Sequence, residues 1–236
     1  MASVLENIEI APAIWRLRVA AVPKGEPGQF FMLRTAAGID PFLSRPISIC
    51  DATETETAFV YRVAGRGTAL LSQLRAGDAL ETGLPLGNGF PLCKGRAVLI
   101  GGGLGIAPLL YLAKRLREIN TCTHVYVGYS GEPFLQAEYA ALGAFYPKRG
   151  GYITQDVDFS QPATYYACGP EPMLRAAAQR ARASGAQLYV SMESRMACGT
   201  GACLGCSLIT ARGNRRVCKD GPVFAAADVF FEEASV

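Results

Sequence analysis

The sequence predicts an antiparallel β-barrel, a doubly wound parallel α/β sheet and a small cysteine-rich C-terminal domain, in that order along the chain. Short β-rich runs separated by Gly, Pro and Asp occupy residues 1–92 and are typical of a small barrel. Residues 94–190 repeat a strand followed by a helix, which indicates a parallel sheet. Four of the eight cysteines crowd into residues 198–218. We therefore expect three domains, at residues 1–93, 94–190 and 191–236.

Composition excludes several classes of protein. The 236 residues are 50% hydrophobic and 18% charged, which allows a buried core. The 23 Lys and Arg nearly balance the 20 Asp and Glu without a dense basic run, so we expect no nucleic-acid partner. Residues 1–15 lack the Lys or Arg of a secretory signal, and residues 98–113 are too short and too rich in glycine to span a bilayer. We expect a cytoplasmic protein without a membrane span.

Four strands are expected in the barrel, at residues 14–19, 29–33, 47–50 and 58–63. The third strand begins near Arg45-Pro46-Ile47-Ser48, which brings a cation and a hydroxyl to the start of a strand. Gly67 and Thr68 precede a helix predicted at residues 69–74. Both patterns suit the binding of a phosphate group, and both are also common as a plain strand entry and a helix N-cap.

The α/β domain opens with a buried strand at residues 97–100 and a helix at residues 108–118. Between them lies a glycine-rich turn with Gly101, Gly102, Gly103 and Gly105. In this context glycines let the backbone approach a pyrophosphate at the helix N-terminus, although a tight turn without a ligand is the alternative. Further strands at 124–129 and 164–167 precede helices at 134–141 and 172–183.

Cys168, Gly169 and Pro170 follow the strand at residues 164–167. Ligands of open α/β sheets bind at the carboxyl ends of the strands, where this segment is expected to lie. Cys168 is therefore a candidate to contact a cofactor, and a small buried side chain is the alternative.

The choice between NAD and NADP depends on the segment after the second strand of this domain. Residues 128–147 contain no Lys or Arg to receive a ribose 2′-phosphate, whereas Glu132 and Glu138 suit a free 2′-hydroxyl. The sequence therefore favours NAD, with Lys148 just beyond the window. His124 is the only histidine and lies within a predicted strand, so we expect it to be structural.

The clustered cysteines carry the most specific signal in the chain. Cys198, Cys203, Cys206 and Cys218 follow the spacing C-x4-C-x2-C-x11-C, and the first three match plant-type [2Fe–2S] sites. Glycines at 199, 201 and 205 let the backbone wrap closely around a cluster. A zinc ribbon would present two C-x2-C pairs, and disulfides are rare inside cells, so both are the weaker alternatives.

The other cysteines lie far apart in the sequence. We expect Cys50, Cys93 and Cys122 to be small buried residues without a chemical role.

The order of these motifs resembles the ferredoxin–NADP reductase superfamily over residues 1–190. In that superfamily a flavin-binding barrel precedes a nicotinamide-binding α/β domain, and the cysteine of the C-G-P segment lies beside both rings. The resemblance implies FAD at the barrel motifs, NAD at the glycine turn and the C-G-P segment, and Cys168 beside the rings. The implied FAD residues are Arg45, Pro46, Ile47, Ser48, Val60, Tyr61, Arg62, Gly67 and Thr68, and the implied NAD residues are Gly101, Gly102, Gly103, Gly105, Gly169 and Pro170.

Residues 195–206 and 216–224 extend the likeness to the whole chain, which resembles the electron transfer subunits of class 1B dihydroorotate dehydrogenases. The resemblance implies a relay from dihydroorotate through the FMN of a catalytic subunit, a [2Fe–2S] cluster and FAD to NAD⁺. It also implies pyrimidine biosynthesis and a heterotetramer with two subunits of each kind. The gap before Cys218 is much shorter than in plant ferredoxins, so the fold around the cluster should follow this family.

Two other functions stay open at this point. The chain could be a reductase component with the same cofactors that serves another redox partner, or a non-enzymatic zinc-bound regulatory module. Met196, Leu204 and Phe224 are either the core of the last domain or apolar contacts to a partner.

Overall fold

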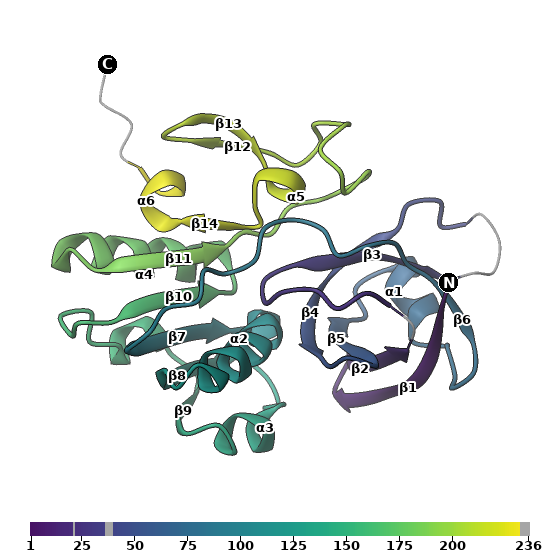
Figure 1. Ribbon diagram of the computed structural model, residues 1–236, viewed down its shortest axis with the longest axis horizontal. Coiled ribbons are helices and arrows are strands. Elements are labelled where there is room, and N and C mark those ends of the chain that lie inside the picture. Colours follow the sequence, from purple (N-terminus) through teal and green to yellow (C-terminus); the bar gives the residue numbers. More distant parts are fainter. Residues whose placement is uncertain (21, 36–39, 232–236) are drawn as a thin grey trace.

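A closed antiparallel barrel forms the N-terminal part of the computed structural model, which describes residues 1–20, 22–35 and 40–231 (Figure 1). The strand order is β1-β2-β5-β4-β3-β6. Inward-facing residues such as Leu17, Phe31, Leu33 and Phe59 are fully buried and form its core. The elements are β1 (Ala2–Ala11), β2 (Ile14–Ala20), β3 (Phe30–Thr35), β4 (Arg45–Ala52), β5 (Glu56–Arg62), α1 (Arg66–Leu71) and β6 (Ala79–Glu81). The barrel prediction is confirmed.

Two elements of the barrel differ from the sequence pattern. β1 was not predicted, because register shifts near Val4 and Glu9 interrupt the alternation of buried and exposed residues that marks a strand. α1 begins three residues before the predicted helix. The Thr68 hydroxyl accepts hydrogen bonds from the backbone N–H groups of Ala64 and Gly65, at 3.0 and 3.2 Å, and so organises the turn into the helix.

The second part is a six-stranded sheet in the order β14-β11-β10-β7-β8-β9, parallel except for β14. Alternate residues of the central strand β7 face opposite sides: Ala97 and Leu99 pack toward α2, whereas Val98 and Ile100 pack toward α4. The sheet is therefore doubly wound, as predicted. Its elements are β7 (Arg96–Gly102), η1 (Gly103–Gly105), α2 (Ile106–Glu118), β8 (Cys122–Tyr129), α3 (Gln136–Ala140), β9 (Ala144–Arg149), η2 (Ile153–Asp156), β10 (Thr164–Cys168), α4 (Glu171–Ser184) and β11 (Gln187–Ser191).

The C-terminal lobe contains β12 (Ser207–Thr210), β13 (Gly213–Arg216), α5 (Val217–Asp220), β14 (Val223–Ala225) and α6 (Ala226–Val229). β14 pairs antiparallel with β11, so the chain returns from the lobe to the edge of the large sheet (Figure 1). Cys206 and Cys218 are buried in the same core cluster as Leu174 of α4. The lobe thus shares its core with the α/β sheet.

Helix α2 also connects the sheet to the barrel. The Tyr111 hydroxyl donates a hydrogen bond to the Gly25 carbonyl at 2.9 Å, and Lys114 forms an ion pair with Asp51 of β4. These contacts fasten α2 to the barrel. Within the described part of the chain, no helix combines the length and the apolar character needed to cross a membrane.

Two candidate cofactor cavities and a cysteine loop

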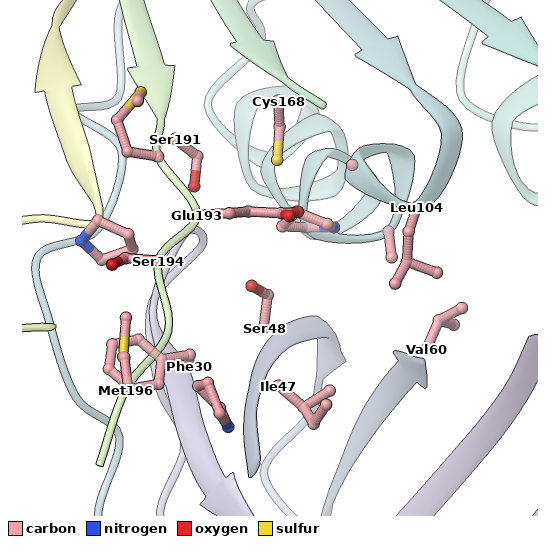
Figure 2. A pocket seen from close by; sticks show the side chains of 16 residues that line it. Phe30, Ile47, Ser48, Val60, Leu104, Cys168, Ser191, Glu193, Ser194 and Met196 are labelled. Atoms are coloured by element: carbon pink, nitrogen blue, oxygen red, sulfur yellow. The ribbon is translucent and has the colours of Figure 1, made fainter. Parts of the chain in front are cut away.

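A cavity of about 200 Å³ lies where the barrel meets the α/β sheet, and we call it the central cavity. Sequence-predicted residues from both halves meet here: Ile47, Ser48 and Val60 on the barrel side, and Gly105 and Cys168 on the sheet side (Figure 2). The full lining is Phe30, Pro46, Ile47, Ser48, Val60, Leu104, Gly105, Ala107, Pro108, Cys168, Ser191, Met192, Glu193, Ser194, Met196 and Pro222. The cavity has an apolar floor with a few polar groups, as is typical of cofactor sites.

Cys168 lies at the carboxyl end of β10, and its thiol points into the central cavity opposite the hydroxyl of Ser48 (Figure 2). The side chain is 3% exposed. Burial, with a smaller contribution from the nearby Glu193 carboxylate, raises the pKa of the Cys168 thiol to about 12, and a hydrogen bond with Ser191 opposes the change. Cys168 is therefore a neutral thiol at physiological pH, suited to contact and positioning and not to nucleophilic attack.

The two candidate phosphate motifs of the barrel come together although 22 positions separate Arg45 from Gly67. A Cβ atom at Gly67 would lie only 2.4 Å from Nε of Arg45, so only glycine allows the guanidinium this close to the backbone. Within the described part of the chain, Arg45 also donates to two backbone carbonyls of the neighbouring loop, those of Leu43 and Ser44. A guanidinium held beside a turn in this way can donate to the phosphates of a dinucleotide.

Two residues of the predicted barrel motifs, Tyr61 and Thr68, have side chains with other contacts. Tyr61 lies in the barrel core and its hydroxyl donates to Oδ1 of Asn7 at 3.1 Å, because neighbouring residues of a strand point to opposite faces. Thr68 uses its hydroxyl on the turn before α1. Arg62, at the end of β5, points toward the sheet and lines a second cavity.

This second cavity, which we call the outer cavity, has a volume of about 990 Å³. It lies over the carboxyl ends of the parallel strands, where open α/β sheets bind nucleotides. Of the predicted nucleotide residues, Gly102, Gly103, Gly105, Gly169 and Pro170 line it. The other lining residues are Arg62, Leu104, Gly128, Tyr129, Ser130, Gly150, Gly151, Tyr152, Ile153, Thr154, Gln155, Pro172, Met173, Ala176, Gln179, Arg180 and Glu193.

The glycines of the turn have distinct roles. A Cβ at Gly105 would lie 2.3 Å from the carbonyl oxygen of Cys168, so glycine lets the turn pack directly on the end of β10. Gly101 lies inside β7 and does not line the cavity. A Cβ there would lie 2.9 Å from Ile106, so this position is enclosed by packing. Gly103 has a φ of +54° and open space around it, which leaves its backbone accessible to a ligand.

Glu193 is the site residue that sequence reasoning missed. It follows β11 and lines both the central and the outer cavity, so the exposed surface of its side chain faces the two cavities. Its surroundings raise the pKa of the Glu193 carboxyl through desolvation, and the charge of Arg62 opposes this. The carboxyl-end rule that selected Cys168 applies equally to the residues after β11 and would have found it.

The far end of the outer cavity differs from the sequence interpretation. Neither Glu132 nor Glu138 lines the cavity, and Glu138 forms an ion pair with Arg16 of the barrel at 3.4 Å. The nearest lysine, Lys148, pairs with Asp156 at 2.8 Å beside Gly151. The glutamates therefore do not support the preference for NAD.

Cys198, Cys203 and Cys206 lie on the loop between β11 and β12, which we call the cysteine loop (residues 198–206), and Cys218 lies in α5. The Sγ atom of Cys198 accepts hydrogen bonds from the N–H groups of Thr200 and Cys203, both at 3.4 Å. These bonds lower the pKa of the Cys198 thiol to about 5. The Cys218 N–H donates to Sγ of Cys206 at 3.5 Å, so the thiols fall into two neighbouring pairs.

This arrangement fits an iron–sulfur cluster better than a zinc ion. Gly199 and Gly201 have φ values of +71° and +85°, which lets the loop curl with its N–H groups facing sulfur. Among the described residues, no three or more His, Cys, Asp or Glu side chains converge on the position of a single ion. Four thiolates in two pairs are the donor set of a two-iron cluster, whereas zinc requires tetrahedral convergence on one point.

The remaining cysteines agree only in part with the expectation of burial. Cys50 is buried and Cys93 is half-buried, but Cys122 is exposed at the start of β8. Its Sγ lies 3.7 Å from Nε2 of His124, whose ring also stacks on Tyr146. Cys122 occupies the outward side of its strand, and this part of the expectation is wrong.

Comparison with known proteins agrees with these sites. Residues 193–230 match the family model of the iron–sulfur cluster binding domain of dihydroorotate dehydrogenase B. The electron transfer subunit of dihydroorotate dehydrogenase B (NAD(+)) from Clostridium acetobutylicum is 37% identical, covering 98% of this chain and 96% of that protein. The corresponding subunit from Clostridium perfringens is 39% identical, covering 97% and 96%.

Solved structures show the same architecture. A chain of an NADH-dependent reduced ferredoxin–NADP oxidoreductase superposes with a TM-score of 0.88 at 25% identity, covering 97% of this chain and 89% of that chain. A cytochrome P450 reductase from Amycolatopsis superposes with a TM-score of 0.66 at 23% identity, covering 78% and 65%, and shares the fold.

The barrel, the parallel sheet and the cysteine loop together define an iron–sulfur flavoprotein oxidoreductase related to the ferredoxin–NADP reductases, with FAD, NAD and a [2Fe–2S] cluster as cofactors. Sequence identity above 35% to the two Clostridium subunits, over almost the whole length, narrows the assignment from this class to one family. The chain belongs to the family of electron transfer subunits of dihydroorotate dehydrogenase B. The family and cofactors expected from the sequence are confirmed.

Proposed function

We propose that this chain carries electrons from the FMN of a dihydroorotate dehydrogenase catalytic subunit through the [2Fe–2S] cluster and FAD to NAD⁺, in pyrimidine biosynthesis. The observation that carries the proposal is the segment from Ser191 to Cys198. Within these few residues Glu193 lines both cavities, Met196 lines the central cavity and Cys198 begins the cysteine loop. One short stretch of backbone therefore joins all three candidate sites.

The flavin site proposed here combines the central cavity with Arg45 and Gly67. FAD would supply the exchange between two-electron hydride transfer and single-electron transfer that such a relay requires. Ile47, Ser48 and Val60 would hold the ring system from the barrel side. The Arg45 guanidinium, packed against Gly67, would neutralise the pyrophosphate.

We place NAD in the outer cavity, where it would be the substrate. Gly102, Gly103 and Gly105 would hold its pyrophosphate at the beginning of the 13-residue helix α2. The neutral Cys168 thiol and the Glu193 carboxyl would border the place where nicotinamide meets flavin, because Glu193 lines both cavities and Cys168 the inner one.

We propose Cys198, Cys203, Cys206 and Cys218 as the four ligands of the cluster, with Cys198 and Cys203 on one iron and Cys206 and Cys218 on the other. The hydrogen bonds within each pair support this assignment. The N–H groups of Thr200 and Cys203 stabilise the thiolate form of Cys198, the form that binds metal.

Assembly and location extend the proposal. We infer a complex with two copies of each subunit, in line with the family resemblance, and no nucleic-acid partner. All eight cysteines are free, which supports the reducing environment of the cytoplasm. We retain domain boundaries at residues 93 and 190, with β14 returning across the second boundary to the large sheet.

Anaerobic co-purification with the catalytic subunit from the same source tests the proposed function. We expect the two chains to associate and dihydroorotate to reduce NAD⁺ only when both are present. The matched control is Cys203→Ser, which should keep FAD and lose iron. Failure of the wild-type chains to associate or to reduce NAD⁺, with FAD and iron bound, would contradict the assigned partner.

A second candidate is a reductase component that serves another redox partner. The TM-score of 0.88 to a chain of an NADH-dependent reduced ferredoxin–NADP oxidoreductase supports it, because the same architecture there belongs to a different complex. NADH-dependent reduction of a ferredoxin without dihydroorotate activity would favour this candidate. The pairing of the cysteines gives no support to a zinc-bound regulatory module, which would be colourless and free of iron.

A further inference from the structure

The wall that separates the central cavity from the cysteine loop is formed by two short chain segments. Met196 lines the cavity two residues before Cys198, and Pro222 lines it four residues after Cys218 (Figure 2). Each segment therefore runs from the cavity lining directly to a cysteine. The backbone bond from Met192 N–H to the Pro222 carbonyl, at 2.8 Å, fastens the two segments to each other.

Met196 is the long, flexible side chain of this wall. It faces the central cavity and is half-buried, and it packs against the core cluster that contains Phe30, Cys206 and Cys218. Methionine fills irregular gaps well because its side chain is unbranched and polarizable. The sequence left open whether Met196 belongs to the core of the lobe or contacts a partner. The structure assigns it to the interior, between cavity and cysteines.

The barrel side of the same region is packed tightly as well. A Cβ at Gly199 would lie 2.7 Å from Cγ of Met32 on β3, so the cysteine loop rests directly on the barrel. Met32 pairs with Pro46 of β4, and Pro46 lines the central cavity. The cysteine loop is thus in contact, through one layer of side chains, with the structure that surrounds the cavity.

We propose that Met196 is a positioning residue for electron transfer: it fills the gap between the flavin cavity and the cluster ligands and keeps water out of it. This inference rests on the proposed function, because it requires FAD in the central cavity and the cluster on the four cysteines. Electron transfer between two centres slows steeply as the gap widens or fills with water. Packed side-chain atoms in the gap therefore favour the transfer.

The test uses the anaerobic full-length chain loaded with FAD and iron, in three forms: wild type, Met196→Ala and Met196→Leu. Mixing with NADH should show two phases, reduction of the flavin and then uptake of one electron by the cluster. We expect Met196→Ala to slow the second phase about tenfold, a barrier change of about 1.4 kcal/mol, and to leave the first phase unchanged. Met196→Leu, which nearly keeps the volume, should retain the wild-type rate.

A second measurement separates this role from a purely structural one. Iodide should quench flavin fluorescence more strongly in Met196→Ala than in wild type, because water and ions enter the opened wall. Redox titration should give unchanged potentials for flavin and cluster. Ile209→Ala is the control, since Ile209 is 64% exposed in the same lobe and lines neither cavity.

The outcomes distinguish the two proposals. If the wild-type chain binds no FAD or no iron, the proposed function itself is wrong. If wild type shows both phases and Met196→Ala changes neither the second phase nor the quenching, the role of Met196 is overturned and the proposed function stands. Should Met196→Ala lose FAD or iron, Met196→Gln replaces it with the same expectations, because glutamine keeps the length and draws water into the wall.

Discussion

The barrel and the C-terminal lobe are stabilised in different ways. The barrel closes on itself and buries Leu17, Phe31 and Phe59 completely. The lobe has one two-stranded sheet and short helices, with Leu204 and Ile209 60% and 64% exposed. Burial of apolar surface supports the barrel without a cofactor, whereas so small a lobe depends on the large sheet and on a bound group. Loss of the metal should therefore affect the two regions unequally.

Replacing one cysteine should give the largest difference between the regions. Cys203→Ser removes a proposed ligand whose N–H also bonds Sγ of Cys198. We expect loss of stoichiometric iron and faster proteolysis within the lobe, with FAD still bound to the barrel. Iron content, the visible spectrum and limited proteolysis measure this. Cys122→Ser, at the other exposed cysteine outside the loop, should change none of them; retained iron in Cys203→Ser would contradict the ligand assignment.

The barrel can be tested with the complementary change, which should affect FAD and leave iron in place. Arg45→Ala removes the guanidinium beside Gly67. A hydrogen bond to a charged group contributes roughly 1.5–3 kcal/mol, so FAD should bind about 30-fold more weakly. Fluorescence titration of the apoprotein with FAD checks this. Arg75→Ala, at a distant turn of the barrel, is the matched control, and equal affinity in Arg45→Ala and wild type would exclude Arg45 from the FAD site.

These two regions also show how much the sequence could predict. The motifs at Arg45 and Gly67 were found separately, and their contact was not, because it depends on the barrel closing. The cysteine spacing predicted the iron–sulfur domain, since three of the four proposed ligands lie within residues 198–206. The residues after β11 follow the same carboxyl-end rule as Cys168, but only the fold shows that Glu193 lines two cavities. Local patterns predict elements and loops, whereas the meeting of distant elements becomes visible only in the fold.

A smaller effect is expected on the pH dependence of protein stability. It compares the buried thiol of Cys168 with an exposed side chain that does not ionise. Burial raises the pKa of Cys168 from 9.0 to about 12, so the unfolded chain loses this proton first as pH rises. Its contribution to stability is complete below pH 9 and is lost as pH rises from 9 toward 12. As pH rises from 8 to 10, the free energy of unfolding of Cys168→Ala should therefore fall by about 1 kcal/mol less than that of wild type.

Denaturant unfolding of the apoprotein at several pH values measures this difference. Ile209→Ala, which changes an exposed side chain without an ionisable group, should follow the wild-type pH dependence. Parallel curves for wild type and Cys168→Ala would show that the Cys168 thiol does not resist ionisation in the folded state.

The smallest expected effect concerns the two ends of the outer cavity. At the flavin end Arg62 faces Glu193, and at the far end Lys148 lies behind the lining residue Gly151, where Asp156 pairs with it at 2.8 Å. The far end is the proposed place for the adenosine ribose, because the nicotinamide has to reach the flavin. Asp156→Asn would release the charge of Lys148 toward a 2′-phosphate. An exposed ion pair contributes up to ~1 kcal/mol, so the ratio of NADP to NAD affinity should rise about threefold.

Calorimetric titration of the full chain with NADP⁺ and with NAD⁺ gives this ratio directly. Glu132→Gln is the control: it also removes one negative charge, but the carboxylate paired with Lys148 is that of Asp156, so its ratio should equal that of wild type. An unchanged ratio in Asp156→Asn would mean that the ion pair has no part in coenzyme selection. A ratio that rises equally in both variants would point instead to the overall charge of the protein, because only a local effect distinguishes Asp156 from Glu132.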